Sequence, residues 1–108
     1  MENYKLLINH FAQNDIEKAR EYFNNKKNTL GEEFWKEVKA KLEQIEENPN
    51  QFQIIVDEAR RANLKRFPFG IFYIVKDLII NVFGVIHFSR SPELWQKRVE
   101  KGGDTDDK

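Results

Sequence analysis

Residues 69–88 read FGIFYIVKDLIINVFGVIHF and form the most apolar part of the chain. Residues 69–75 and 78–88 are rich in Ile, Val and Phe, a composition typical of buried strands. Only Lys76 and Asp77 separate the two runs, a spacing that predicts a tight turn and an antiparallel hairpin. This hairpin belongs to a sheet, so the rest of the chain must supply the other strands and the helices that pack on them.

Three shorter stretches upstream also have the pattern of strands. Residues 4–8 alternate apolar and polar side chains, as a half-buried strand does. Residues 53–57 are short and apolar, and residues 62–67 alternate loosely. Together with the hairpin, these stretches predict an antiparallel-rich sheet of four to five strands.

Two helices are predicted between the first strand and the second. Asn14 opens an N-capping pattern, which predicts a helix over about 14–26. Thr29 opens a capping box, and the apolar stripe behind it ends before Pro49, a residue that cannot continue a helix. Because only the Asn/Lys-rich loop 24–28 joins the two helices, we expect an antiparallel helical hairpin covering one face of the sheet.

The C-terminal part predicts a short helix followed by a tail. Ser91 and Pro92 have the form of an N-cap and a first helical residue, so a helix is expected from Pro92 to about Val99. Residues 1–100 then form a single α+β domain: an N-terminal strand, a helical hairpin, the four- to five-stranded sheet and this short helix. Residues 101–108 have no apolar side chain and are expected to form a flexible acidic tail.

The composition excludes several classes of protein. With 40% hydrophobic and 13% aromatic residues among 108, the chain can bury one core. It has no cysteine, which excludes disulfides, a thiol nucleophile and Cys-ligated metals. Its two histidines are isolated and no Gly-rich phosphate loop is present, so we expect neither a metal ion nor a cofactor. Without a long apolar run or a secretory signal, a cytoplasmic protein that does not enter membranes is expected.

The charges are unevenly distributed along the chain. The 18 basic and 18 acidic side chains give a net charge of zero. Residues 1–58 carry 8 basic and 12 acidic side chains, whereas residues 59–100 carry 8 basic and 3 acidic ones. The neutral total argues against indiscriminate nucleic-acid binding, but the local excess allows one basic face for an anionic partner.

Five basic residues of the second half are candidates for binding an anion or a partner. If residues 60–66 are extended, Arg61 and Lys65 lie on one face, and Arg60 and Arg66 lie on the other. The alternative is that these side chains are only solvated on an exposed sheet face. The candidates are Arg60, Arg61, Lys65, Arg66 and Arg90.

His87, near the end of the longest predicted strand, is the one candidate general acid or base. A histidine that ends a strand more often hydrogen bonds the next turn, and both interpretations stay open. Tyr73 is expected to pack in the core, since it lies in a densely aromatic segment. Trp95 is expected to anchor the last helix to the rest of the domain.

Five short motifs follow one another along residues 4–98. In this order and spacing they resemble the RelE/ParE toxin superfamily, the toxins of bacterial type II toxin–antitoxin modules. The resemblance implies a β-α-α-β-β-β core, a small neutralising antitoxin and a bacterial cytoplasm. The motifs are Asp15-Ile16…Ala19…Tyr22, Leu30-Gly31…Phe34, Ile45…Asn48-Pro49…Phe52, the segment 66–73 and the segment 85–90.

The RelE-like branch of this superfamily cuts mRNA on the ribosome. In this chain Lys65, Arg66, His87 and Arg90 would supply only part of the catalytic site of such an enzyme, and the set is incomplete. Members of this branch carry an Arg just before the Tyr-containing strand and an aromatic, Tyr or His near the C-terminus. Here Gly70 stands at the Arg position, and the C-terminal Tyr has no match.

The ParE-like branch resembles inhibitors of DNA gyrase that lack a nuclease site. The segment 67–73 and the pair His87…Arg90 are similar to this branch, and the missing Arg at position 70 favours it. We therefore expect a plasmid-stabilisation toxin that binds gyrase and a cognate antitoxin, whereas ribosome and mRNA are the targets in the alternative. A third alternative is a degenerate member that keeps the fold only to bind its antitoxin. Whether the chain is an enzyme stays open.

Overall fold

The computed structural model describes residues 3–100, except for the side chain of Glu100. The α+β class and the predicted order of elements are confirmed. The elements are β1 (Lys5–Ile8), α1 (His10–Lys26), α2 (Leu30–Glu47), a 3-10 helix η1 (Pro49–Gln51), β2 (Gln53–Val56), β3 (Ala59–Asn63), β4 (Phe69–Lys76), β5 (Ile79–His87) and α3 (Pro92–Glu100).

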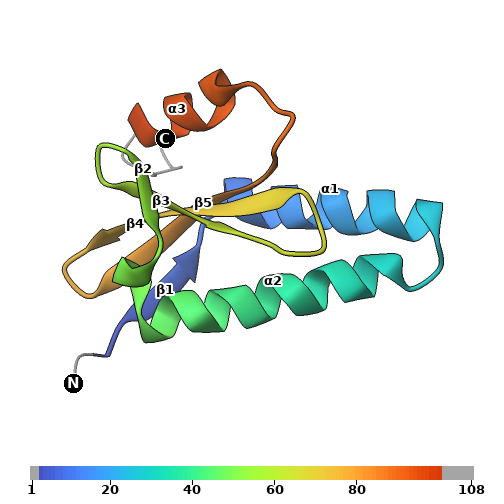
Figure 1. The fold of residues 1–108 in the computed structure, drawn as a ribbon, viewed down its shortest axis with the longest axis horizontal. Helices are drawn as coiled ribbons and strands as arrows, with labels where there is room; N and C mark the ends of the chain where they lie inside the picture. The colour runs from blue at the N-terminus through green and yellow to red at the C-terminus, as the bar shows by residue number, and fades with distance from the viewer. Residues whose placement is uncertain (1–2, 101–108) are drawn as a thin grey trace.

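The five strands form one sheet in the order β1-β5-β4-β3-β2 (Figure 1). All neighbours pair antiparallel except β1, which runs parallel to β5. Asp77 joins β4 to β5 in a left-handed conformation, with φ 56°, as tight hairpin turns require. The hairpin predicted from residues 69–88 is confirmed and lies at the centre of the sheet.

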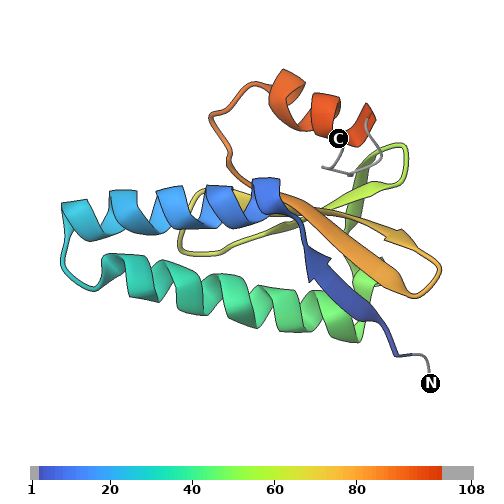
Figure 2. The same ribbon diagram turned by 180° about the vertical axis from the view of Figure 1, so that it is seen from behind.

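Helices cover both faces of the sheet. The hairpin of α1 and α2 lies against one face, and α3 lies against the other (Figures 1 and 2). Phe34 of α2 packs with Ile71 and Tyr73 on the first face, whereas Trp95 of α3 packs against Phe72 on the second, with 5.5 Å between ring centroids. The sheet thus separates two apolar clusters, and both Tyr73 and Trp95 pack as predicted.

The first helix begins at His10, four residues before the predicted start at Asn14. Asn9 is the N-cap: its side-chain oxygen accepts a hydrogen bond from the Ala12 N–H, with an N–O distance of 3.0 Å. The Asn9 N–H itself donates to the carbonyl of Val82 in β5, at 2.9 Å. The prediction of a cap at Asn14 is wrong because the helix starts where the pairing of β1 with β5 ends.

The second helix begins at Leu30, but Thr29 does not act as a side-chain cap. Thr29 has φ 72°, and its side chain makes no capping hydrogen bond. Asn24 of α1 takes this role, since its Oδ1 accepts a hydrogen bond from the Gly31 N–H at 2.7 Å. A Cβ atom at Gly31 would lie 2.4 Å from the Arg20 carbonyl oxygen, so glycine allows the two helices to approach closely.

The third strand ends earlier than the sequence indicated for residues 62–67. Arg60 and Arg61 lie within β3 and point to opposite faces, as predicted. Lys65 and Arg66 lie beyond β3, in its connection to β4. The prediction that they share the faces of a strand with Arg61 and Arg60 is therefore wrong.

The final helix begins as predicted, because the Ser91 hydroxyl oxygen accepts a hydrogen bond from the Glu93 N–H at 3.2 Å. The tail predicted at 101–108 lies outside the described residues. Among the residues that the structure describes, no helix is both long enough and apolar enough to cross a membrane.

Candidate functional site

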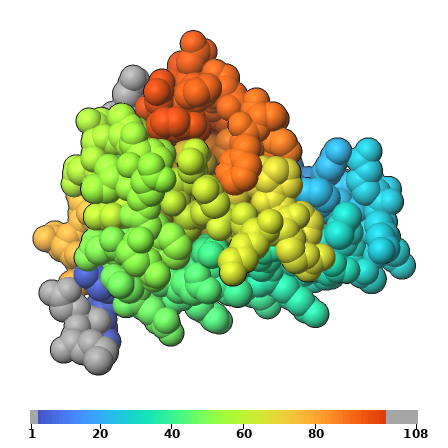
Figure 3. Space-filling model, viewed as in Figure 1, coloured from blue at the N-terminus to red at the C-terminus, as the bar shows by residue number. Residues whose placement is uncertain are grey.

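The β3–β4 connection and the β5–α3 connection lie side by side at one end of the sheet, where yellow and orange segments meet in Figure 3. The Phe88 N–H donates to the Pro68 carbonyl at 2.8 Å and joins the two connections. We call residues 61–70 together with residues 86–90 the basic end. It carries four of the five predicted cationic residues, namely Arg61, Lys65, Arg66 and Arg90.

Arg60, the fifth of these residues, is not part of the basic end. Its Nη1 donates to the carbonyls of Asn50 and Phe52, at 3.1 and 2.6 Å. These bonds join β3 to the chain around η1, so Arg60 has a structural role. The predicted set of five partner-binding residues therefore splits into one structural arginine and four residues of the basic end.

Carboxylates of α2 hold the β3–β4 connection in place. Glu37 accepts hydrogen bonds from the backbone N–H groups of Lys65 and Arg66. The Arg66 guanidinium also pairs with Glu33, with 2.6 Å between Nη2 and Oε1. The hydrogen bond from Arg66 lowers the pKa of the Glu33 carboxyl below its usual value. Arg66 is therefore already engaged by a carboxylate on the surface.

Arg61 and Gly70 pack against each other on the face that α3 covers. A Cβ atom at Gly70 would lie 2.8 Å from Cγ and 2.9 Å from Cδ of Arg61. The Arg61 guanidinium lies over the ring of Phe88, 5.9 Å from its centroid, and Phe88 is 48% exposed. The stem of Arg61 thus occupies the space that a side chain at position 70 would need.

His87 hydrogen bonds the following turn, which is one of the two interpretations that the sequence left open. Its Nδ1 accepts a hydrogen bond from the Ser89 N–H at 2.9 Å, and its ring lies edge-on to Phe69, 5.1 Å between centroids. His87 and Arg90 line a cavity of about 200 Å³. Lys18 of α1 lies in the same lining and was not predicted.

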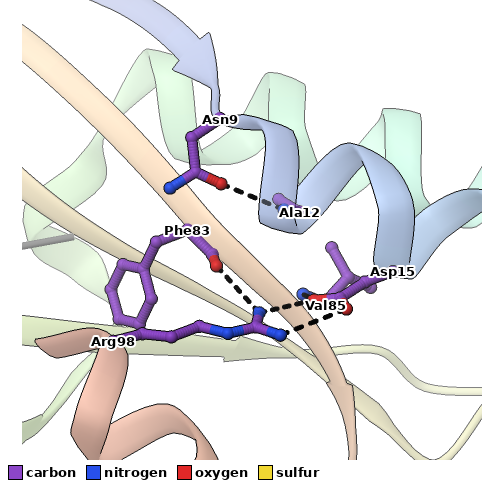
Figure 4. A network of polar contacts seen from close by, with 6 residues as sticks. All are labelled: Asn9, Ala12, Asp15, Phe83, Val85 and Arg98. Carbon is purple, nitrogen blue, oxygen red and sulfur yellow. Dashed lines mark hydrogen bonds and ion pairs between the residues drawn. The ribbon is translucent and has the colours of Figure 1, made fainter. Parts of the chain in front are cut away.

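Asp15 also lines this cavity and belongs to a polar network that the sequence did not predict (Figure 4). Arg98 of α3 pairs with Asp15 of α1, with 2.7 Å between Nη1 and Oδ2. Arg98 also donates to the Phe83 carbonyl at 3.0 Å, and Asp15 accepts from the Val85 N–H at 3.0 Å. These two backbone groups of β5 lie past Val82, the last residue of β5 that pairs with β1. The ion pair therefore provides hydrogen-bond partners for two backbone groups at the edge of β5 that β1 does not reach.

Within residues 3–100, no group of three or more His, Asp or Glu side chains is placed to hold a metal ion.

Solved structures share this fold. The chromosomal ParDE toxin–antitoxin system from P. aeruginosa aligns with a TM-score of 0.71 and 16% identity, over 78% of this chain and 95% of that one. A mutant of E. coli toxin RelE in the free state aligns with a TM-score of 0.64 and 18% identity, over 93% and 98%. The RelE mutant in complex with a RelBc antitoxin peptide gives 0.60 and 18%, over 89% and 94%. These likenesses define the RelE/ParE type of fold.

The sequence places the chain within that class. Residues 6–92 match the family model of the ParE toxin of the type II toxin–antitoxin system, parDE, and the chain belongs to this family. No curated protein sequence matches the chain.

Proposed function

We propose that this ParE-family toxin inhibits DNA gyrase and is neutralised by a cognate antitoxin that binds the basic end. Membership of the ParE family over residues 6–92 supports the assignment to a toxin–antitoxin module. The resemblance of the segment 67–73 and of the pair His87…Arg90 to ParE-like gyrase inhibitors supports the target. The ribosome is the alternative target, and the packing of the site favours gyrase over it.

The packing around Gly70 is the observation that carries the choice of gyrase. An RNase must fix cations against the scissile phosphate and must provide a base for the ribose 2′-hydroxyl. The resemblance places one of these cations at position 70, where a side chain would collide with the stem of Arg61. The side chain of Arg66 is paired with Glu33, and His87 Nδ1 is occupied by the Ser89 N–H. These engagements favour a binding surface over a nuclease site.

The same surface suits an antitoxin. It combines Arg61, Lys65 and Arg90 with the exposed ring of Phe88. A chain that is partly acidic and partly apolar, and that folds on binding, is complementary to such a surface. The compared E. coli RelE mutant is itself in complex with an antitoxin peptide.

Expression of the wild type and of His87→Gln in bacteria tests the proposal. Gln keeps hydrogen-bonding capacity but cannot transfer a proton near neutral pH. We expect both forms to arrest growth equally and neither to produce ribosome-dependent mRNA cleavage. Cleavage by the wild type that is lost in His87→Gln would establish the nuclease instead, and growth without arrest in the wild type would establish a degenerate, antitoxin-binding member.

A further inference from the structure

The cavity beside His87 combines an apolar floor with a cationic rim. It lies between α1 and the end of β5, and the β5–α3 connection closes one side. Ala19, Phe69, Val85 and Leu94 contribute apolar surface. Lys18, His87 and Arg90 contribute polar groups, and Lys18 and Arg90 each carry a positive charge.

The remaining charged group in the lining is already neutralised. Asp15 pairs with Arg98 at 2.7 Å and accepts the Val85 N–H, so its carboxylate does not offset the charges of Lys18 and Arg90. His87 accepts the Ser89 N–H on Nδ1, which leaves its proton on Nε2 in the neutral form. The rim therefore offers N–H donors and a net positive charge.

The volume and the mixed lining limit what can bind. A cavity of about 200 Å³ is smaller than the pockets that typically hold drug-sized ligands, which are roughly 300–1,000 Å³. A bare phosphate would satisfy the rim but would leave uncovered the apolar surface that Leu94 and its largely buried neighbours Phe69 and Val85 contribute to the lining. One apolar side chain with a carboxylate beside it satisfies both the floor and the rim, as anchor residues at interfaces do.

We propose that this cavity binds an apolar anchor side chain of a partner peptide, and that Lys18 and Arg90 bind a carboxylate next to that anchor. The inference rests on the proposed function, because an antitoxin is the partner that would supply such a segment. The anchor side chain would bind between α1 and the β5–α3 connection, where the positive charges of Lys18 and Arg90 lie next to apolar surface.

The probe for this cavity is 3-phenylpropionate, which joins a ring to a carboxylate. We expect it to shift the amide resonances of Val85, His87 and Ser89 saturably in ¹⁵N-labelled full-length protein. Two matched probes distinguish the contribution of the carboxylate from that of the ring. 3-Phenylpropanol has the ring but no charge, and inorganic phosphate has the charge but no ring. Each should bind at least about tenfold more weakly, since a factor of ten corresponds to the loss of one modest interaction.

Charge variants make the test specific. Lys18→Glu/Arg90→Glu should weaken phenylpropionate binding by about tenfold or more. Lys5→Glu/Lys76→Glu makes the same change in net charge at exposed positions away from the cavity and should bind as the wild type does. If the first variant does not give a folded spectrum, Lys18→Gln/Arg90→Gln removes the charges without reversing them.

Three results would overturn the proposal: phosphate binding as tightly as phenylpropionate, equal affinity in the Lys18/Arg90 and Lys5/Lys76 variants, or no saturable shift at the cavity amides. The first would make the cavity a simple anion site. Because binding is measured on the toxin alone, none of these results depends on gyrase. Growth arrest by the wild type reports on the toxin function separately.

Discussion

Arg98 and Asp15, 83 positions apart in the sequence, form an ion pair that also bonds the backbone of β5 on both sides of Gly84. The pair joins α1, α3 and the sheet (Figure 4). The two side chains are 13% and 18% exposed, so each would be left poorly solvated without the other. This contact fixes α3 on the sheet, and its Asp15 also lines the cavity beside His87.

Asp15→Ala should lower the free energy of unfolding by about 2–3 kcal/mol, because it leaves a largely buried guanidinium and the Val85 N–H without their partner. Urea denaturation measures this loss. Glu32→Ala is the control, since it breaks the Arg20–Glu32 pair, whose side chains are 33% and 54% exposed. Exposed pairs contribute roughly 0–1 kcal/mol, and equal losses in the two variants would show that the Asp15 network does not stabilise the fold.

Trp95→Ala tests the docking of α3 on the sheet. Trp95 packs against Phe72 and the cluster around Phe83, so its removal should cost about 3 kcal/mol, at the lower end for such truncations because the ring is only partly buried. Thermal or urea unfolding measures the effect. A loss below about 0.5 kcal/mol would mean that α3 is loosely docked and that Trp95 is available as a contact residue.

Tyr73 makes the stability sensitive to alkaline pH. It is fully buried and its hydroxyl donates to the Pro49 carbonyl. Burial raises the pKa of Tyr73 to about 12 from 10.0, and the positive charge of Arg60 opposes this shift in part. Above pH 10 the unfolded chain releases the phenolic proton while the folded chain keeps it, so stability should fall as pH rises from 10 to 12.

The size of this effect follows from the pKa difference. The shift corresponds to about 2 kcal/mol lost by pH 12, and to about 3 kcal/mol at higher pH, where the phenol of the folded chain is also ionised. Tyr73→Phe removes this titration, so urea unfolding of the variant at a series of pH values should show a shallower decline above pH 10. Parallel declines in wild type and variant would place the alkaline sensitivity elsewhere.

Arg61→Glu/Arg66→Glu should weaken antitoxin binding. The change reverses two charges at the basic end, and it places a second carboxylate beside Glu33, which pairs with Arg66 in the wild type. Calorimetric titration with the cognate antitoxin should show at least about a tenfold loss of affinity at physiological salt. Lys5→Glu/Lys76→Glu is the matched control, and an unchanged affinity in the Arg61/Arg66 variant would remove this region from antitoxin recognition.

The sequence predicts the sheet well because the patterns that mark its strands lie within short segments of the chain. The apolar runs on either side of Lys76 and Asp77 predict the β4–β5 hairpin, and Pro49 predicts the end of α2. The start of α1 was predicted wrongly because the capping pattern at Asn14 is a local signal, whereas the observed cap is Asn9. Only the pairing of β1 with β5, a contact between distant residues, selects Asn9.

The site is predicted only in part, for the same reason. His87 and Arg90 are neighbours in sequence, and their residue types mark them as candidates. Lys18 of α1 lines the same cavity as these two residues. Asp15 pairs with Arg98, which is 83 positions later in the sequence. Neither contact can be inferred from local spacing. The roles of Arg60 and Arg66 depend on carbonyls and carboxylates contributed by η1 and α2.

Inhibition of supercoiling by purified DNA gyrase is the direct test of the proposed function. The wild-type toxin, added without antitoxin, should block conversion of relaxed plasmid to supercoiled plasmid, and an equimolar amount of cognate antitoxin should restore it. Undiminished supercoiling at a large molar excess of folded toxin, together with mRNA cleavage on ribosomes by the same preparation, would contradict the account.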